Sequence, residues 1–150
     1  ERVKKQINIE TETAVRQLDD ILQAPEAKFI DEITIGCSDL SESMKTSRWS
    51  AGFMSEVVKV VKKIKSRNIP VSVGGGITPE TINDYLKQVE PDKFNTRVIT
   101  FKVDPGRGYL EAVRSALRFE VLMLEYDSSR KFISRDEEKF RIKELKKRMK

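Results

Sequence analysis

The 150-residue chain is 38% hydrophobic and 35% charged, carries a net charge of +5 and has the composition of a globular protein. It has no histidine and one cysteine, Cys37, which excludes an intrachain disulfide, a cysteine-rich zinc site and a histidine base. No apolar run reaches the about 20 residues that span a bilayer, so we expect a cytoplasmic protein with no membrane partner.

The spacing of apolar residues predicts a regular alternation of strands and helices. In chain order we expect a strand at residues 3–9, a helix at 14–22, a strand at 29–35, a helix at 57–64, a strand at 69–73, a helix at 78–89, a strand at 98–103, and helices at 110–126 and 134–149. A polar loop is expected at residues 41–52.

Local signals set several of these boundaries. Pro25 ends the first helix and Gly36 stops the second strand. Thr78 is expected to cap the third helix, and Ser134 with Glu137 forms a capping-box pattern for the last one.

This alternation predicts an α/β fold, with a parallel sheet covered by helices. Four βα units and an extra C-terminal helix make half of a (β/α)8 barrel, and a whole barrel needs about 250 residues. We therefore expect residues 1–150 to be a single domain, the C-terminal portion of such a barrel. The chain starts without methionine inside an expected strand, which indicates missing N-terminal strands. A doubly wound sheet is the competing fold, but no GxGxxG motif follows the first strand.

Two carboxylates follow the first two expected strands. Glu10 and Asp39 stand at strand ends, where parallel α/β folds place their active sites. Neighbouring strands lie about 4.8 Å apart, so both side chains could reach one ion. Without histidine, the ligands must be oxygens, which favours Mg²⁺ or Mn²⁺. The structural alternative is that Glu10 is a first-turn helix carboxylate and Asp39 caps a turn.

An ordered set of motifs resembles the second half of the HpcH/HpaI aldolase/citrate lyase family. The matching segments are Asn8-Ile9-Glu10-Thr11, Leu18-Asp19-Asp20-Ile21-Leu22 and Gly36-Cys37-Ser38-Asp39-Leu40-Ser41. They correspond in order and spacing to the family's "IET" strand end, "NLDEI" helix and "G-x-x-DL-S" strand end. Later segments are similar to one subgroup, namely Val73-Gly74-Gly75-Gly76, Thr96-Arg97 and Leu117-Arg118-Phe119-Glu120.

The resemblance implies a barrel of the phosphoenolpyruvate/pyruvate type that cleaves or forms carbon–carbon bonds. Its substrate would be a 2-oxo acid or a malyl- or citramalyl-type compound, and the reaction would pass through a metal-stabilised enolate. By this resemblance Glu10 and Asp39 match the Mg²⁺ or Mn²⁺ ligands. The substrate pocket would be lined by Gly36, Cys37, Ser38 and Leu40.

The sequence also departs from the family. The arginine that polarises the 2-oxo group and the acid–base residues lie on earlier strands in relatives, so we expect this chain by itself to be inactive. It is expected to form a homo-oligomer or to pair with the missing N-terminal half. Cys37 stands where relatives often have proline or arginine, and Lys45 where they often have glycine.

Other features of the sequence allow alternative functions. Gly74, Gly75 and Gly76 before a helix could bind phosphate, as in many barrels, or form only a tight turn. Lys102 could form a Schiff base, and Cys37 is more simply an apolar filler than a nucleophile. The non-enzymatic alternative is a half-barrel interaction module. Basic residues alternate with apolar ones on helix faces, so no nucleic-acid partner is expected.

Overall fold

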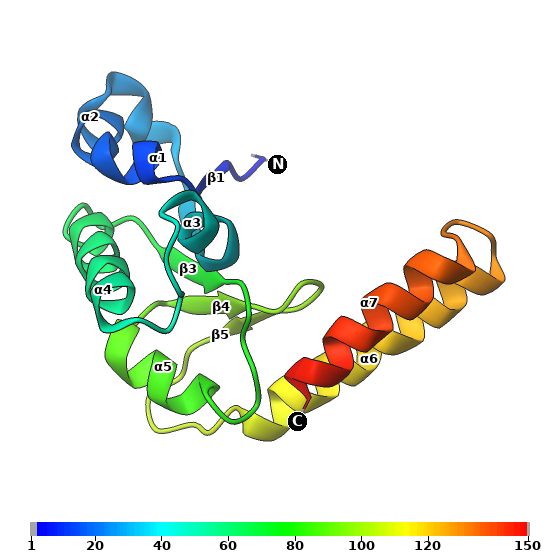
Figure 1. Ribbon diagram of the computed structural model, residues 1–150. Coiled ribbons are helices and arrows are strands. Elements are labelled where there is room, and N and C mark those ends of the chain that lie inside the picture. The colour runs from blue at the N-terminus through cyan, green and yellow to red at the C-terminus, as the bar shows by residue number, and fades with distance from the viewer. Residues whose placement is uncertain (1–2, 150) are drawn as a thin grey trace.

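A five-stranded sheet in the order β1-β2-β3-β4-β5 organises the chain, as the computed structural model shows for the described residues 3–149 (Figure 1). The strands are β1 (Gln6–Ile9), β2 (Glu32–Gly36), β3 (Val71–Gly74), β4 (Lys93–Asn95) and β5 (Thr100–Lys102). The first four are parallel, and β5 pairs antiparallel with β4. The α/β fold class predicted from the sequence is confirmed.

The helices of the described chain follow the strands in the expected alternation, with additional short ones. They are α1 (Glu12–Arg16), α2 (Leu18–Gln23), the 3-10 helix η1 (Pro25–Phe29), α3 (Cys37–Ser43), α4 (Ala51–Lys65), α5 (Ile82–Val89), α6 (Leu110–Ser129) and α7 (Arg135–Arg148). Within residues 3–149 no helix is long and apolar enough to cross a membrane.

One face of the sheet is apolar and forms the core. Ile33 and Ile35 of β2 are fully buried and cluster with Val57 and Ile64 of α4. Because side chains alternate along a strand, the intervening residues point to the opposite face. Removing these β-branched residues from water supplies the main stabilisation of the sheet, about 1.5–3 kcal/mol for each fully buried side chain.

The other face of the sheet carries a row of polar residues joined across strands. Gln6 Nε2 donates to Thr34 Oγ1, and the hydroxyl groups of Thr34 and Ser72 are 2.5 Å apart. Asn95 Nδ2 donates to Ser72 Oγ at 3.4 Å. These hydrogen bonds connect the four parallel strands across the polar face, whereas the opposite face is held by apolar contacts.

The prediction for residues 98–103 was wrong in direction and incomplete. This segment forms the antiparallel strand β5, and the fourth parallel strand is β4, which the sequence analysis missed. Phe94 and Phe101 stack at a centroid distance of 4.8 Å and hold the hairpin together. Strands of three residues are too short for a periodic apolar pattern, so the sequence analysis did not identify β4.

Several helix and strand boundaries also differ from the prediction. The helix expected at 14–22 is divided at Gln17, and α5 begins at Ile82, after a turn in which Thr78 Oγ1 accepts from Thr81 N. The expected loop at 41–52 contains the end of α3 and the start of α4. The first strand begins at Gln6 instead of residue 3, and residues 1 and 2 of the expected chain start lie outside the described residues.

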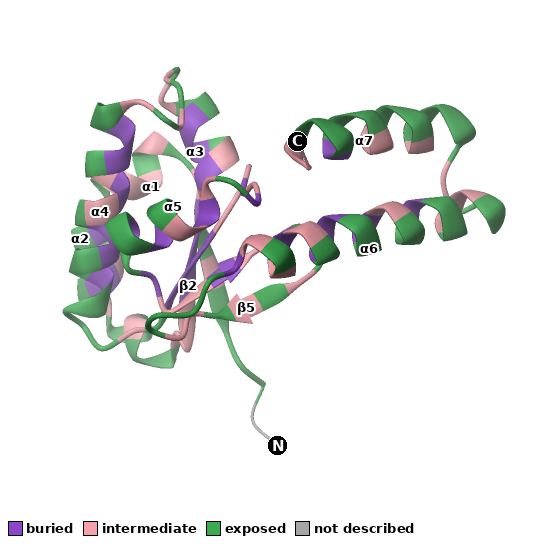
Figure 2. Ribbon diagram, turned by 90° about the horizontal axis from the view of Figure 1, so that it is seen from below, coloured by how far each residue is buried: buried purple, intermediate pink, exposed green. Residues whose placement is uncertain are grey.

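Helices α6 and α7 form a hairpin that extends away from the sheet (Figures 1 and 2). As predicted, Ser134 caps α7, accepting from Glu137 N at 3.1 Å. The apolar stripe of α7 packs inward, with Leu145 buried and Ile142 and Met149 against the core cluster. The distal part of the hairpin is mostly exposed.

Candidate metal and substrate site

Four positions at the carboxyl ends of β1 to β4 form one row on the polar face of the sheet. The register pairs Gly36 with Gly74, and Gly74 with Asn95. Glu10 follows Ile9, which pairs with Ile35, so Glu10 is level with Gly36. Two adjacent glycines in the middle of the row contribute no side chains, so the space between Glu10 and Asn95 is bordered by the side chains of these two residues.

Glu10 and Asp39 face the same space beside Gly36. A Cβ atom on Gly36 would stand 3.0 Å from Glu10 Oε2 and 3.8 Å from Asp39 Oδ2. Within residues 3–149 neither carboxylate has an ion-pair or hydrogen-bond partner. The two oxygens therefore approach one point that a larger residue at position 36 would fill.

The structural alternative to metal binding applies to only one of the two carboxylates. Asp39 is in the first turn of α3, where a negative charge also favours the helix dipole. Glu10, by contrast, precedes the cap of α1, because Thr11 is the N-cap and accepts from Ala14 N. The first-turn carboxylate of α1 is Glu12, so Glu10 has no comparable structural role.

The donor set fits a hard divalent ion. Two unpartnered carboxylates can supply two oxygens and leave the remaining positions for water or substrate oxygens. In the described part of the chain no group of three or more His, Cys, Asp or Glu residues gathers, so a closed, protein-only metal cage is not formed.

The glycine turn after β3 packs directly against Ser38 and Arg48. Gly75 has φ +96° and Gly76 has φ +66°, conformations that glycine adopts without strain. A Cβ on Gly75 would lie 2.6 Å from Ser38 N, and one on Gly76 would lie 2.0 Å from Arg48 Cζ. Arg48 Nη1 in turn donates to Ser38 Oγ at 2.9 Å. The turn thus makes room for an arginine at the strand ends.

The phosphate hypothesis for Gly74, Gly75 and Gly76 invoked a helix starting directly at this turn. Helix α5 begins only at Ile82, and the guanidinium of Arg48 lies against Gly76. The turn therefore lacks the adjacent helix N-terminus on which that hypothesis depended.

Two of the predicted pocket residues have buried side chains. Leu40 is 0% exposed and Cys37 is 3% exposed. Cys37 Sγ lies 3.2 Å from the hydroxyl of Tyr85, and burial raises the pKa of this thiol against the opposing effects of Tyr85 and Arg48. Cys37 is therefore an apolar filler, as the sequence favoured, and only Gly36 and Ser38 of the predicted set border the open space. Lys45 keeps a left-handed conformation, φ +50°, where relatives often have glycine.

Asn95 is a site residue that the sequence analysis missed. Its Oδ1 atom is buried and has no hydrogen-bond partner among the described residues, although its Nδ2 donates to Ser72. An unsatisfied buried acceptor at the end of the row can accept a hydrogen bond from a substrate hydroxyl or from water. The three-residue length of β4 hid this position from the pattern of apolar residues.

Basic residues border the row on the α6–α7 side. Arg148 donates from Nε and Nη2 to the carbonyl of Ile77, which follows the glycine turn. Arg97 Nε lies 3.9 Å from Glu120 Oε1, and Glu120 is 2% exposed with its Oε2 unpaired within residues 3–149. Arg97, Glu120 and Arg148 line a small cavity of about 170 Å³.

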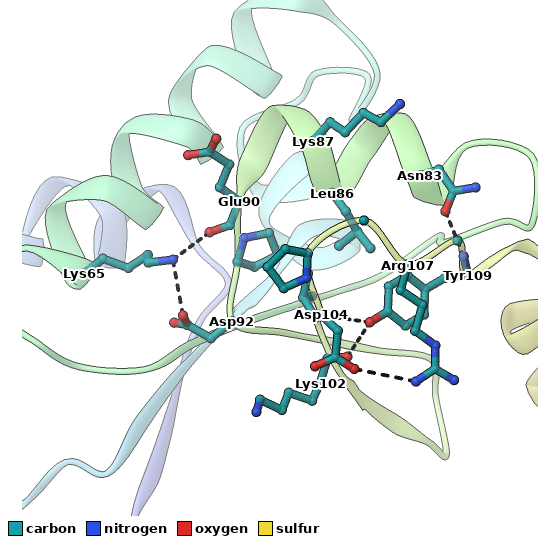
Figure 3. Close-up of a pocket in the computed structure, with 15 residues that line it drawn as sticks. Lys65, Asn83, Leu86, Lys87, Glu90, Asp92, Lys102, Asp104, Arg107 and Tyr109 are labelled. Carbon is teal, nitrogen blue, oxygen red and sulfur yellow. Dashed lines mark hydrogen bonds and ion pairs between the residues drawn. The ribbon is translucent and has the colours of Figure 1, made fainter.

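A cavity of about 780 Å³ lies at the opposite edge of the sheet (Figure 3). Lys102 lines it, because β5 runs antiparallel and pairs Lys102 with Lys93 at the start of β4. Lys102 does end a strand, as expected, but this end lies at the edge of the sheet away from Glu10 and Asp39. Tyr109 donates to the carbonyl of Lys102 and accepts from Asp104 N, both at 2.7 Å, so polar groups here hold the β5–α6 loop in place.

The four parallel strands β1 to β4 alternate with helices, and Glu10 and Asp39 lie at the carboxyl ends of these strands. This is where α/β barrels place their sites. The fold is similar to that of a solved HpcH/HpaI aldolase/citrate lyase family protein from Burkholderia cenocepacia J2315. The TM-score is 0.52 at 17% identity, and the match covers 77% of this chain and 42% of that one. The chain thus spans less than half of the compared protein. No protein-family model matches the sequence, and neither does any curated protein.

Proposed function

We propose that the protein is a divalent-metal-dependent carbon–carbon lyase of the aldolase type, related to the HpcH/HpaI aldolase/citrate lyase family. The observation that carries the proposal is the approach of Glu10 Oε2 and Asp39 Oδ2 to one point beside Gly36. The activity is proposed for the whole protein, because the chain matches 42% of the compared structure. The substrate class is a 2-oxo acid or a malyl- or citramalyl-type compound.

Residues at the carboxyl ends of the strands have separate roles in this proposal. Glu10 and Asp39 hold Mg²⁺ or Mn²⁺, and backbone groups at Gly36 and Ser38 contact the substrate. When bound, the ion supplies Lewis-acid stabilisation of the negative charge that develops on the 2-oxo oxygen as the bond breaks. Asn95 Oδ1 accepts a hydrogen bond from the substrate. The proposal places the acid–base group outside residues 3–149.

Calorimetric titration with Mn²⁺ tests the metal site directly. We expect the wild type to bind Mn²⁺, and Glu10→Gln and Asp39→Asn each to weaken binding at least about 10-fold, since each removes one of two charged ligands.

Matched controls separate ligation from a general loss of charge. Glu12→Gln and Asp84→Asn remove exposed first-turn carboxylates of α1 and α5. Both should bind Mn²⁺ as the wild type does. Equal affinities in all five proteins would reject the metallo-lyase proposal.

A second candidate function is association through the helical hairpin. Phe119, Leu122, Met123 and Tyr126 fall at i, i+3, i+4 and i+7 of α6 and are 37–61% exposed. This stripe lies away from the buried stripe that includes Leu124. A helix with a second, uncovered apolar stripe is typical of an interaction surface.

We propose that a second copy of the chain covers this surface. Adding Phe132 and Phe140, at 72% and 66% exposure, and taking about 200 Å² for each large side chain, the exposed apolar area is roughly 700 Å². This approaches the about 800 Å² per partner of a standard interface. Sedimentation equilibrium should show a dimer that Leu122→Ser and Tyr126→Ser dissociate. A wild-type monomer at all concentrations would reject the association.

A further inference from the structure

Arg48 is held in a defined position at the carboxyl ends of β2 and β3. Its Nη1 donates to Ser38 Oγ at 2.9 Å, and its guanidinium occupies the volume that any side chain at Gly76 would need. Gly75 contributes in the same way, because a Cβ there would collide with Ser38. Two consecutive positive-φ glycines therefore position one arginine.

The charge of Arg48 is not compensated within residues 3–149. It forms no ion pair there, and its hydrogen-bond acceptor is a neutral hydroxyl. Other arginines add to the positive charge near Arg48. Burial lowers the pKa of Arg148, Glu120 opposes this shift, and the charges of Arg48 and Arg97 lower the pKa further. Glu120 thus offsets part of the charge of Arg97 and Arg148, whereas Arg48 forms no ion pair within residues 3–149.

The position of Arg48 relative to the carboxylate pair is fixed by the sheet. Glu10 and Asp39 follow β1 and β2, whereas Arg48 lies against residues that follow β2 and β3. Neighbouring strands lie about 4.8 Å apart. A small molecule with oxygens at both ends of such a span can contact both groups.

We propose that Arg48 is a substrate-binding residue that binds an anionic oxygen, of a carboxylate or a phosphate, beside the carboxylate pair. Its planar guanidinium has N–H groups left after the bond to Ser38, and such a fork binds carboxylate and phosphate oxygens in pairs. The role in substrate binding depends on the proposed lyase function, whereas binding of a simple anion does not. The group bound is either the carboxylate of the 2-oxo acid itself or a second anionic group on the substrate.

Binding of inorganic phosphate without metal tests the anion site independently of the lyase proposal. Calorimetry should show that Arg48→Gln weakens phosphate binding about 10- to 100-fold, the effect of one charge-assisted hydrogen bond. Arg48→Lys should recover only part of the affinity, because it keeps the charge without the fork. Gly76→Ala, which displaces the guanidinium, should reproduce the loss while Arg48 is present.

Two controls show that the effect is local. Arg67→Gln removes an exposed arginine in the turn after α4 and should leave phosphate binding unchanged. The circular dichroism of Arg48→Gln should equal that of the wild type, and its Mn²⁺ affinity should not fall, because both carboxylate ligands are intact. A loss of phosphate binding in Arg67→Gln, or none in Arg48→Gln and Gly76→Ala, would overturn the proposal.

Titrations of the Mn²⁺-loaded protein with three 2-oxo acids identify which group Arg48 binds. If pyruvate, 2-oxoglutarate and phosphonopyruvate all bind more weakly to Arg48→Gln, the residue holds the 2-oxo acid carboxylate. If only the last two weaken, it holds the second anionic group. Unchanged affinity for all three would reject the role in substrate binding. Absence of Mn²⁺ binding with intact phosphate binding would reject the lyase proposal and keep the anion site.

Discussion

Replacing Gly36 with alanine tests whether the space between the two carboxylates is functional. Gly36 has φ −83°, a conformation that alanine adopts readily, so backbone strain does not enter. The added methyl group would lie 3.0 Å from both Cβ and Oε2 of Glu10 and 3.8 Å from Asp39 Oδ2. Because the Cβ of Glu10 is fixed to the neighbouring strand, the sheet itself must shift to admit the methyl group.

The expected size of the effect follows from two opposing contributions. Overpacking of this kind costs about 1–3 kcal/mol, and the reduced entropy of the unfolded chain returns about 0.4–1 kcal/mol. We therefore expect Gly36→Ala to lower the free energy of unfolding by about 1–2 kcal/mol, measured by urea denaturation. Mn²⁺ affinity should fall more than about 10-fold, because the methyl group separates the two ligands.

Gly52→Ala is the matched control for this variant. Gly52 is in the first turn of α4, and a Cβ there would meet nothing within 4 Å. The same chemical change should stabilise the protein by roughly 0.5–1 kcal/mol and leave Mn²⁺ binding unchanged. If Gly36→Ala is as stable as the wild type and binds Mn²⁺ equally well, the reasoning about this space is refuted.

Three further predictions concern the core and the hairpin. Burial raises the pKa of Cys37, so its stabilising contribution is complete below the unfolded thiol pKa of about 8.5 and is lost as pH rises through the folded value. The free energy of unfolding should therefore differ less between pH 8 and pH 10 in Cys37→Ala than in the wild type. An equal difference in both proteins would contradict this. Leu145→Ala should cost about 2–4 kcal/mol in urea denaturation, because this buried side chain attaches α7 to the core, and a cost below 1 kcal/mol would contradict its packing role. Ser134→Ala should cost about 1 kcal/mol by loss of the bond to Glu137 N, with Ser129→Ala as a helix-end hydroxyl control that should change stability less.

The parts of the fold that depend on local patterns were predictable. The strands around Ile9, Ile35 and Val73 are rich in β-branched residues, and the helices between them show the i, i+3 and i+4 spacing of a single buried face. The cap at Ser134 was also identified, because a capping box is a four-residue signal. Such features depend on residues close together in the chain.

The elements that failed depend on contacts between distant or very short segments. The direction of residues 98–103 is decided by pairing with β4 and by the stacking of Phe94 on Phe101. That error placed Lys102 at the wrong edge of the sheet and left Asn95 unnoticed. Strands of three residues carry no periodic signal from which either fact can be derived.

The sequence by itself determined that this is a βα-repeating chain in which Glu10 and Asp39 each follow a strand, because the apolar periods of strands and helices are local patterns. Only the tertiary structure decided that these carboxylates face one point beside Gly36, and that Arg48 lies against the Gly75–Gly76 turn. The physical reason is that side-chain convergence depends on strand register and loop packing, which are set by contacts across the sheet.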